Sequence, residues 1–262
     1  RLGRFFLTGF TRVTADENQQ PVFIKTLGDS VTLWFDLEQD IDALNGNAQL
    51  SLAADANGYD QQFGIPKTNF GRGTLIVRHT DYQNVKNEPA VYTDYLLAKG
   101  TTGANTRIVL HEEGDYEVAL DYEVQDSELT HITSKFGNYR IFLRFSIRNG
   151  NCMVYPFDLL TGAELQNTSV AEAGFSLDLA RSRYLDINVR RAVLVETANG
   201  VIEDERFNRP AKDGDRYTQE GIYTISVSNR YTGESTTKTI FVGSRELLET
   251  YVRNGFSLER LK

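Results

Sequence analysis

The sequence predicts an all-β protein of two tandem antiparallel β-sandwiches with a short C-terminal helical segment. Apolar and polar residues alternate along much of the 262-residue chain, which is typical of strands with one buried and one solvated face. About a dozen such runs are separated by Asn-Gly and Asp-Gly turns, and none alternates with a long helical pattern, which argues against an α/β fold. A motif that recurs in the two halves then sets the number of domains.

The alternation is strongest in a few runs and weaker in several others. In the run 116–124, for example, Tyr116, Val118 and Leu120 fall on one face. The strong runs are 30–37, 116–124, 139–147, 223–227 and 237–242. The weaker runs are 48–53, 73–79, 91–97, 106–110, 152–159, 175–179 and 185–195.

The C-terminal tail has a helical pattern instead. Ser244 can cap a helix, Glu246 would lie in its first turn, and apolar residues recur at helical spacing before Asn254-Gly255 ends it. A helix of about 12 residues is not stable by itself in water. We therefore expect it to pack on the last sheet or to lead into further residues.

An internal repeat indicates two homologous domains. The run Glu113-Gly-Asp-Tyr-Glu-Val-Ala-Leu120 recurs as Glu220-Gly-Ile-Tyr-Thr-Ile-Ser-Val227, 107 positions later. The expected domains are 1–148, 149–243 and a helical tail, 244–262, with Asn149-Gly150 as the turn between the sandwiches. A boundary near residue 130 is one alternative, and a single large jelly roll or barrel is another.

The repeated motif resembles the tyrosine corner of immunoglobulin-like domains, in which a Gly precedes by two residues a Tyr that opens a strand. Tyr116 and Tyr223 occupy that position, and Val118 and Ile225 stand where disulfide-bearing members have Cys. The ending, from Tyr223 through Thr237-Lys-Thr-Ile-Phe-Val242, resembles the last two strands of immunoglobulin-like repeats in large surface proteins of Gram-positive gut bacteria. The resemblance implies tandem immunoglobulin-like sandwiches, with each Tyr hydroxyl bonded to backbone a few residues upstream.

Composition excludes several classes of function. The net charge of −8 disfavours binding to nucleic acid. A single Cys, Cys152, excludes an internal disulfide and any Cys-based zinc site, and three scattered His leave little for catalysis. Hydrolase, metalloprotease and nucleotide-binding motifs are missing. We therefore expect no enzymatic activity and no cofactor.

No apolar run is long enough to span a bilayer, so membrane attachment would come only through an anchor outside this chain.

Aromatic residues in long polar loops are candidate ligand contacts. Exposed aromatic side chains on the loops at one end of a sandwich can bind glycans or proteins, although the same residues can pack a loop onto its own sheet. The candidates are Tyr59, Phe63, Tyr82 and Tyr92.

A calcium loop is a weaker candidate. Asp55, Asn57 and Asp60 place oxygen ligands around Gly58, as calcium loops do. The bidentate Glu that closes an EF-hand loop is missing, and an Asx-rich hairpin turn has the same residues.

An isopeptide bond is a further candidate. In some Gram-positive surface sandwiches such a bond joins a Lys on an early strand to an Asn on the last strand, beside a buried acid. Lys25, Asn229 and Lys238 are of the right residue types, but nothing in their spacing singles them out.

Taken with the resemblance, these observations predict a non-catalytic extracellular segment of a bacterial cell-surface protein. It would act as a spacer or as an adhesion module that contacts an unidentified protein or glycan. The alternative is a carbohydrate-binding module accessory to an enzyme.

Overall fold

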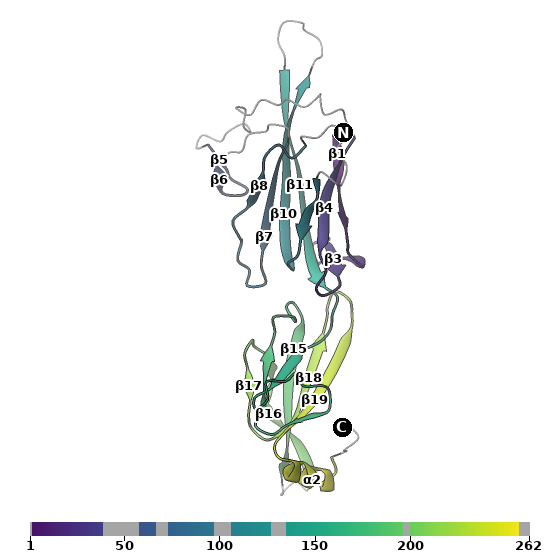
Figure 1. Ribbon diagram of the computed structural model, residues 1–262, viewed down its shortest axis with the longest axis vertical. Helices are drawn as coiled ribbons and strands as arrows, with labels where there is room; N and C mark the ends of the chain where they lie inside the picture. Colours follow the sequence, from purple (N-terminus) through teal and green to yellow (C-terminus); the bar gives the residue numbers. More distant parts are fainter. Residues whose placement is uncertain are drawn as a thin grey trace. The chain divides into compact units, whose positions relative to one another are not determined.

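The computed structural model describes residues 2–38, 58–66, 73–96, 106–126, 135–195 and 200–256. These residues are mostly β-strand, with one short helix among them (Figure 1). The chain divides into two compact units, Arg1–Asn149 (unit 1) and Gly150–Lys262 (unit 2). Asn149 is the last residue of a strand in unit 1, so the expected boundary after residue 148 cuts that strand one residue short.

Unit 1 contains two main sheets and a small hairpin. The three-stranded sheet has the order β1-β4-β9 and consists of β1 (Gly3–Thr8), β4 (Val31–Leu37) and β9 (Ile108–Leu110). The six-stranded sheet has the order β2-β3-β11-β10-β7-β8. Its strands are β2 (Arg12–Ala15), β3 (Pro21–Lys25), β7 (Thr74–Thr80), β8 (Ala90–Tyr92), β10 (Gly114–Asp126) and β11 (Lys135–Asn149). The hairpin pairs β5 (Tyr59–Asp60) with β6 (Ile65–Pro66).

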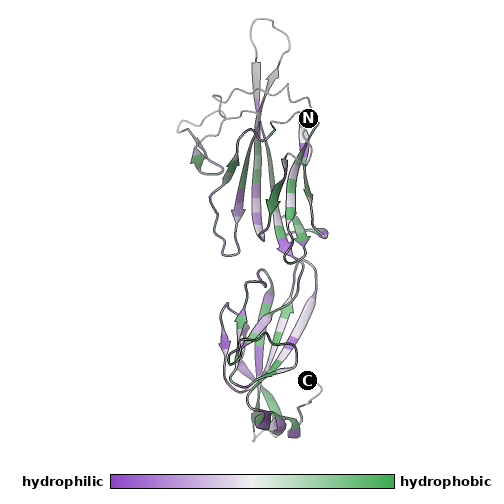
Figure 2. Ribbon diagram, in the orientation of Figure 1, coloured by the Kyte–Doolittle hydropathy of each residue, from purple (hydrophilic) through white to green (hydrophobic). Residues whose placement is uncertain are grey.

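The two main sheets of unit 1 share one apolar core. Alternate residues of β4, Val31, Leu33 and Phe35, are fully buried in the same cluster as Val118 and Leu120 of β10. The other side of each strand is more polar, so hydrophobic and hydrophilic residues succeed one another along the strands (Figure 2). This is the arrangement that period-two alternation predicts for a β-sandwich.

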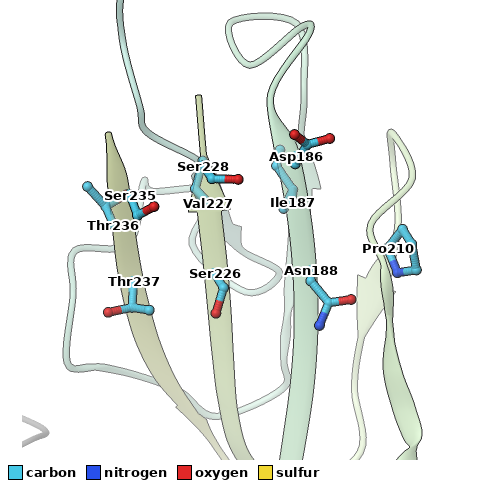
Figure 3. A pocket seen from close by; sticks show the side chains of 10 residues that line it. All are labelled: Asp186, Ile187, Asn188, Pro210, Ser226, Val227, Ser228, Ser235, Thr236 and Thr237. Carbon is cyan, nitrogen blue, oxygen red and sulfur yellow. The ribbon is translucent and has the colours of Figure 1, made fainter. Parts of the chain in front are cut away.

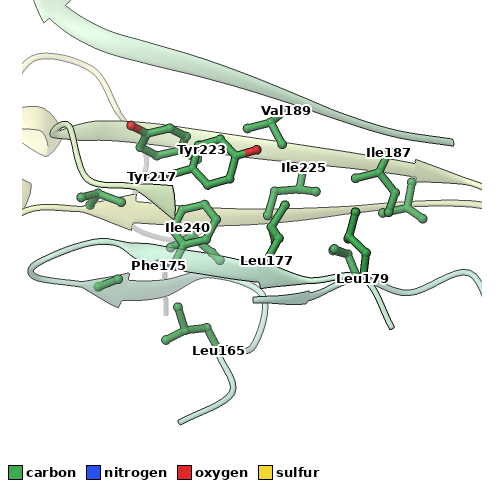
Figure 4. Packing of buried hydrophobic residues seen from close by; sticks show 14 of the residues in the cluster. Leu165, Phe175, Leu177, Leu179, Ile187, Val189, Tyr217, Tyr223, Ile225 and Ile240 are labelled. Atoms are coloured by element: carbon green, nitrogen blue, oxygen red, sulfur yellow. The ribbon is translucent and has the colours of Figure 1, made fainter. Parts of the chain in front are cut away.

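Unit 2 is built from a three-stranded and a five-stranded sheet. The first has the order β12-β14-β17, with β12 (Tyr155–Asp158), β14 (Phe175–Asp178) and β17 (Arg216–Tyr217). The second has the order β13-β19-β18-β15-β16, with β13 (Ser169–Ala171), β15 (Asp186–Val195), β16 (Gly200–Pro210), β18 (Gly221–Ser228) and β19 (Ser235–Val242). Phe175, Tyr223 and Ile240 pack between these sheets (Figure 4), and Cys152 is a buried member of the same core.

Apart from β2, an additional edge strand of unit 1, the two units have matching strand orders, and their last two strands pair in matching register. Tyr116 lies opposite Phe145, and Tyr223 lies opposite Ile240. In both units an early strand also extends the larger sheet by pairing with the last strand: β3 with β11, and β13 with β19.

That added pair corrects the expectation of purely antiparallel sandwiches, because β3 runs parallel to β11 and β13 runs parallel to β19. The early strand covers an edge of the last strand that would otherwise expose unpaired N–H and C=O groups. β3 was not expected from the sequence, and neither was β16, whose exposed residues lack a clear apolar face.

The helix α2 (Arg245–Arg253) belongs to unit 2 and is not a separate tail. Ser244 accepts a hydrogen bond from the backbone N–H of Leu247 at 3.1 Å and so caps the helix. Tyr251 and Leu248 pack against Ile222 and Phe241 of the five-stranded sheet. Packing on a sheet therefore stabilises a helix that is too short to persist alone.

Both repeated tyrosines bond to the backbone that precedes their strand. The Tyr116 hydroxyl donates to the carbonyl of Glu112 at 2.6 Å, and the Tyr223 hydroxyl donates to that of Gln219 at 2.8 Å. Both rings are buried, with exposed fractions of 4% and 0%. Each bond fixes the turn that leads into the penultimate strand of its unit.

Replacing either buried tyrosine with Phe should therefore destabilise the protein. Tyr116→Phe and Tyr223→Phe each remove the hydroxyl that donates to the carbonyl of Glu112 or Gln219, and loss of such a bond costs about 1 kcal/mol. Urea denaturation measures the change in unfolding free energy. Tyr139→Phe is the control, because that side chain is 52% exposed; equal losses in all three variants would show that the two buried bonds contribute nothing.

Candidate functional site

The four candidate ligand-contact aromatics lie in different environments. Tyr59, Tyr82 and Tyr92 are exposed, whereas Phe63 is only 3% exposed. Phe63 packs against Ile76 on the outer face of the six-stranded sheet, so it does not fit a ligand-contact role. The sequence predicts Phe63 as an aromatic residue of a polar loop. In the structure its ring packs the β5–β6 hairpin onto the sheet.

Tyr92 lines a pocket of about 310 Å³ in unit 1, together with His79, His111 and Glu112. Tyr59 and Tyr82 do not line it. A hydrogen bond fixes the His79 ring beside this pocket: its Nε2 lies 2.7 Å from the carbonyl oxygen of Glu113. The structure therefore does not gather the exposed tyrosines around one pocket.

Of the calcium candidates, Asp55 and Asn57 lie outside the described residues. Asp60 forms ion pairs with Arg140, which also binds Asp121 through two nitrogen–oxygen contacts of 2.6 and 2.8 Å. The Asp60 carboxylate also accepts from the backbone N–H groups of Gln62 and Phe63. Asp60 therefore serves as a buried counter-ion. Within the described ranges, no cluster of three or more His, Cys, Asp or Glu could hold a metal ion.

Unit 2 has a pocket of about 540 Å³ on its five-stranded sheet (Figure 3). Its lining consists mainly of small hydroxyl and amide side chains, with one carboxylate from Asp186, and includes no aromatic ring and no basic group. It thus lacks the stacking surface that commonly binds sugars and the positive charge that binds anions. We find no specific chemistry for this pocket.

A cluster with specific chemistry lies where β3 and β11 end. Lys25 is the last residue of β3, Asn149 is the last residue of β11, and the parallel register places them opposite each other. The Lys25 Nζ donates to the Asn149 side-chain Oδ1 at 2.5 Å. Only 3% of Lys25 and 8% of Asn149 is exposed, so an amine and a carboxamide meet largely out of contact with water.

Glu113 completes the cluster from the turn before β10. Its Oε1 accepts from the Asn149 side-chain Nδ2, and its Oε2 accepts from the Asn149 backbone N–H, both at 2.8 Å. The carboxyl group therefore contacts the nitrogen of the same carboxamide whose oxygen contacts Lys25. One Asn side chain lies between an amine and an acid.

Hydrogen bonds to three successive carbonyl groups fix the backbone around Glu113. The carbonyl of Glu112 accepts from the Tyr116 hydroxyl, that of Glu113 lies 2.7 Å from His79 Nε2, and that of Gly114 accepts from Arg148 at 2.9 Å. A side chain at Gly114 would collide with His79 and with the carbonyl of Thr80, and the φ of +150° also favours glycine. The geometry of this turn, which the Tyr116 hydroxyl holds, thus positions the acid.

Burial shifts both ionisable groups of the cluster toward their neutral forms. Desolvation lowers the pKa of Lys25, although the negative charges of Glu113 and Asp29 oppose the shift. Desolvation also raises the pKa of Glu113, against the opposing effects of Asn149, Lys25 and Arg148. The neutral amine is the nucleophilic form, and the protonated carboxyl is a proton donor.

The structure does not pair the other residues that were considered for an isopeptide bond. Asn229 donates from its side chain to the carbonyl of Asn151 at 3.0 Å. Lys238 donates to the carbonyls of Val154 and Leu165, both at 3.2 Å. Asn149 was missed because Asn149-Gly150 was interpreted only as a turn between domains. The signal that could have identified it is its position at the end of a long alternating run.

Comparison with known proteins does not assign this arrangement to a family. No family model matches the chain, and no curated protein shows significant sequence similarity to it. Among the described residues there is also no helix with the length and apolar character needed to cross a bilayer.

The Asp60–Arg140 pair should contribute to stability in a pH-dependent way. Desolvation opposes ionisation of Asp60, but the bonds from Arg140, Phe63 and Gln62 outweigh it and lower the pKa of the carboxyl. Its stabilising effect is therefore present above the ordinary carboxyl pKa and is lost as the pH falls through the lowered value. Asp60→Asn should destabilise the protein by about 1–3 kcal/mol at neutral pH.

Urea denaturation of wild type and Asp60→Asn at pH 7 and at about pH 3 checks this expectation. The difference between the two proteins should shrink in acid, because Asp60 of the unfolded wild-type chain then binds a proton while its lowered pKa opposes protonation in the folded protein. Glu88→Gln is a control, since Glu88 is exposed. A difference that stays constant with pH would show that charge on Asp60 is unimportant.

Proposed function

We propose that this chain is a non-catalytic extracellular segment of a bacterial cell-surface protein, in which two tandem immunoglobulin-like units act as a spacer or an adhesion module. The immunoglobulin-like assignment is supported by the shared strand order of the two units and by the matching bonds of Tyr116 and Tyr223. The acidic charge of the chain agrees with a soluble, well-separated surface module.

The observation that carries the proposal is the parallel pairing of an early strand with the last strand in each unit. The chain enters β3 at Pro21 and leaves β11 at Asn149. A force that reaches β3 from upstream and β11 from downstream therefore pulls the paired strands along their length in opposite directions. All the hydrogen bonds between the strands then share the load, instead of opening one after another. Such shear geometry suits a segment that must stay folded under tension.

The cluster of Lys25, Glu113 and Asn149 strengthens this argument for unit 1. It joins the ends of β3 and β11 through a buried amine and carboxamide. Its acid comes from a third segment, the turn before β10. The strands are thus fastened by side chains as well as by the backbone ladder.

A carbohydrate-binding module is the second candidate, and it is favoured by the exposure of Tyr59 and Tyr82, at 52% and 46%. Exposed tyrosines can stack on sugar rings. Against it, neither tyrosine lines the pocket that contains Tyr92.

Surface exposure can be tested on the bacterium that encodes the chain. Antibodies raised against the 262-residue protein should label intact, unpermeabilised cells, and brief protease treatment of those cells should remove the label. A cytoplasmic protein of the same cells serves as the control for lysis. Labelling that requires permeabilisation would overturn the proposed location.

A glycan array separates the two candidate functions. We expect that Tyr59→Ala and Tyr82→Ala leave any glycan binding unchanged, because neither side chain lines the pocket that contains Tyr92. Tyr139→Ala, which changes another exposed tyrosine, is the matched control. Specific binding that is lost in either loop variant and kept in the control would favour the carbohydrate-binding module.

A further inference from the structure

We propose that unit 1 cross-links itself by a covalent amide bond between the Lys25 side-chain nitrogen and the Asn149 side-chain carbonyl carbon, with Glu113 as the group that transfers the proton. This inference goes beyond the proposed function, because it concerns chemistry inside unit 1 and is independent of where the protein is located. It rests on the contact of Lys25 with Asn149 and on the contacts of Asn149 with Glu113.

The contacts place the reacting groups together before any reaction. The Lys25 Nζ lies 2.5 Å from the Asn149 Oδ1, and the carbonyl carbon under attack is bonded to that oxygen. The parallel register of β3 and β11 fixes both residues, so the amine and the carboxamide meet as parts of one folded unit. For two groups held together in this way, the effective concentration of one at the other can reach about 10⁵ M or more.

The role of Glu113 follows from which nitrogen it touches. Its Oε1 accepts a hydrogen bond from Asn149 Nδ2, the nitrogen that must leave. An amide nitrogen is a poor leaving group unless it is protonated as its bond breaks. Glu113 can therefore give a proton to Nδ2. The charge of Glu113 also acts on Lys25, so the same carboxyl can receive the proton that the Lys25 nitrogen loses as it moves onto the carbonyl carbon. The backbone bonds at Glu112, Glu113 and Gly114 hold it in place for this transfer.

The reaction balances without any added reagent. The neutral Lys25 amine attacks the Asn149 carbonyl carbon and forms a new nitrogen–carbon bond. The bond between that carbon and Nδ2 breaks, one proton moves from the Lys25 nitrogen through the Glu113 carboxyl to Nδ2, and ammonia leaves. Glu113 ends in the protonation state in which it began. The lowered pKa of Lys25 and the raised pKa of Glu113 favour the reactive forms of both groups.

Unit 2 provides an internal control for the same chemistry. Its tyrosine turn carries Glu220 at the place that Glu113 has in unit 1. Counting the same number of residues along the chain brings Ala173 to the place of Lys25 and Ser244 to that of Asn149, both beyond the ends of β13 and β19. Unit 2 therefore retains the acid but lacks both the amine and the carboxamide, so the chain should form one such bond and not two.

Mass spectrometry of the intact protein tests the proposal. The expected mass is about 17 Da below that of the sequence, the mass of one ammonia molecule. A tryptic digest should then contain a branched peptide that joins residues 13–67 to residues 149–181, because trypsin cannot cleave after a modified Lys25. An intact mass equal to that of the sequence, with separate unbranched peptides, would overturn the proposal.

The mass alone is not sufficient, because Asn149 precedes Gly150. An Asn-Gly pair can also lose ammonia by closing a succinimide ring within its own backbone. The variant Lys25→Arg separates the two reactions: the isopeptide bond requires Lys25, whereas the succinimide does not. A 17 Da loss that persists in Lys25→Arg, without a branched peptide in the wild type, would overturn the proposal.

Glu113→Gln tests the assigned role of the acid. It keeps the size of the side chain but cannot shuttle a proton, so the protein should have the full mass of its own sequence and no branched peptide. Glu220→Gln is the matched control in unit 2 and should keep the loss of about 17 Da. If Lys25→Arg or Glu113→Gln fails to fold, the branched peptide of the wild type still decides whether the bond exists.

Thermal unfolding gives a readout of the bond in the full chain. In Glu113→Gln the unfolding transition of unit 1 should occur at a temperature about 10 °C lower than in wild type. The variant lacks the cross-link, so its chain gains more entropy on unfolding. The transition assigned to unit 2 should not move. Equal unit 1 transitions, together with an unmodified wild-type mass, would show that the three groups only form hydrogen bonds.

Discussion

The parallel pairing of β3 with β11 is the constraint on which the rest of unit 1 depends. It covers the edge of the last strand, brings the end of an early strand beside the end of the last one, and joins segments that are 124 residues apart. Lys25 is buried at that position, and Glu113 is partly buried beside it. Burial of an amine and an acid costs free energy unless each finds a partner, and the Asn149 side chain is the partner of both.

The comparison of the two units shows which features belong to the common architecture and which are particular to unit 1. The strand order, the parallel early strand and the tyrosine bond occur in both. The acid in the tyrosine turn occurs in both as well, as Glu113 and Glu220. The equivalent positions differ: unit 1 has the amine of Lys25 and the carboxamide of Asn149, and unit 2 has Ala173 and Ser244.

The sequence predicted the parts of the fold that have strong local patterns. The alternation around Tyr116 and Tyr223 correctly located long paired strands, because one side of each is buried in an apolar core. β3 has only five residues and β16 has no clear apolar face, so neither produced a sufficient pattern. Register between distant strands, which places Lys25 beside Asn149, has no local signal at all. The site was therefore only partly accessible from the sequence: Lys25 was noticed, but its partner was not.

The long separation between Lys25 and Asn149 has a consequence for the way in which unit 1 folds. A chain that is made from its N-terminus presents β3 long before β11 exists, so the larger sheet cannot be completed until nearly all of unit 1 has been synthesised. Folds dominated by such distant contacts form slowly, since the entropy of closing a long loop is lost before the contacts are gained. Until that moment β3 is an edge without its final neighbour, and unit 1 depends on a late, largely all-or-none closure.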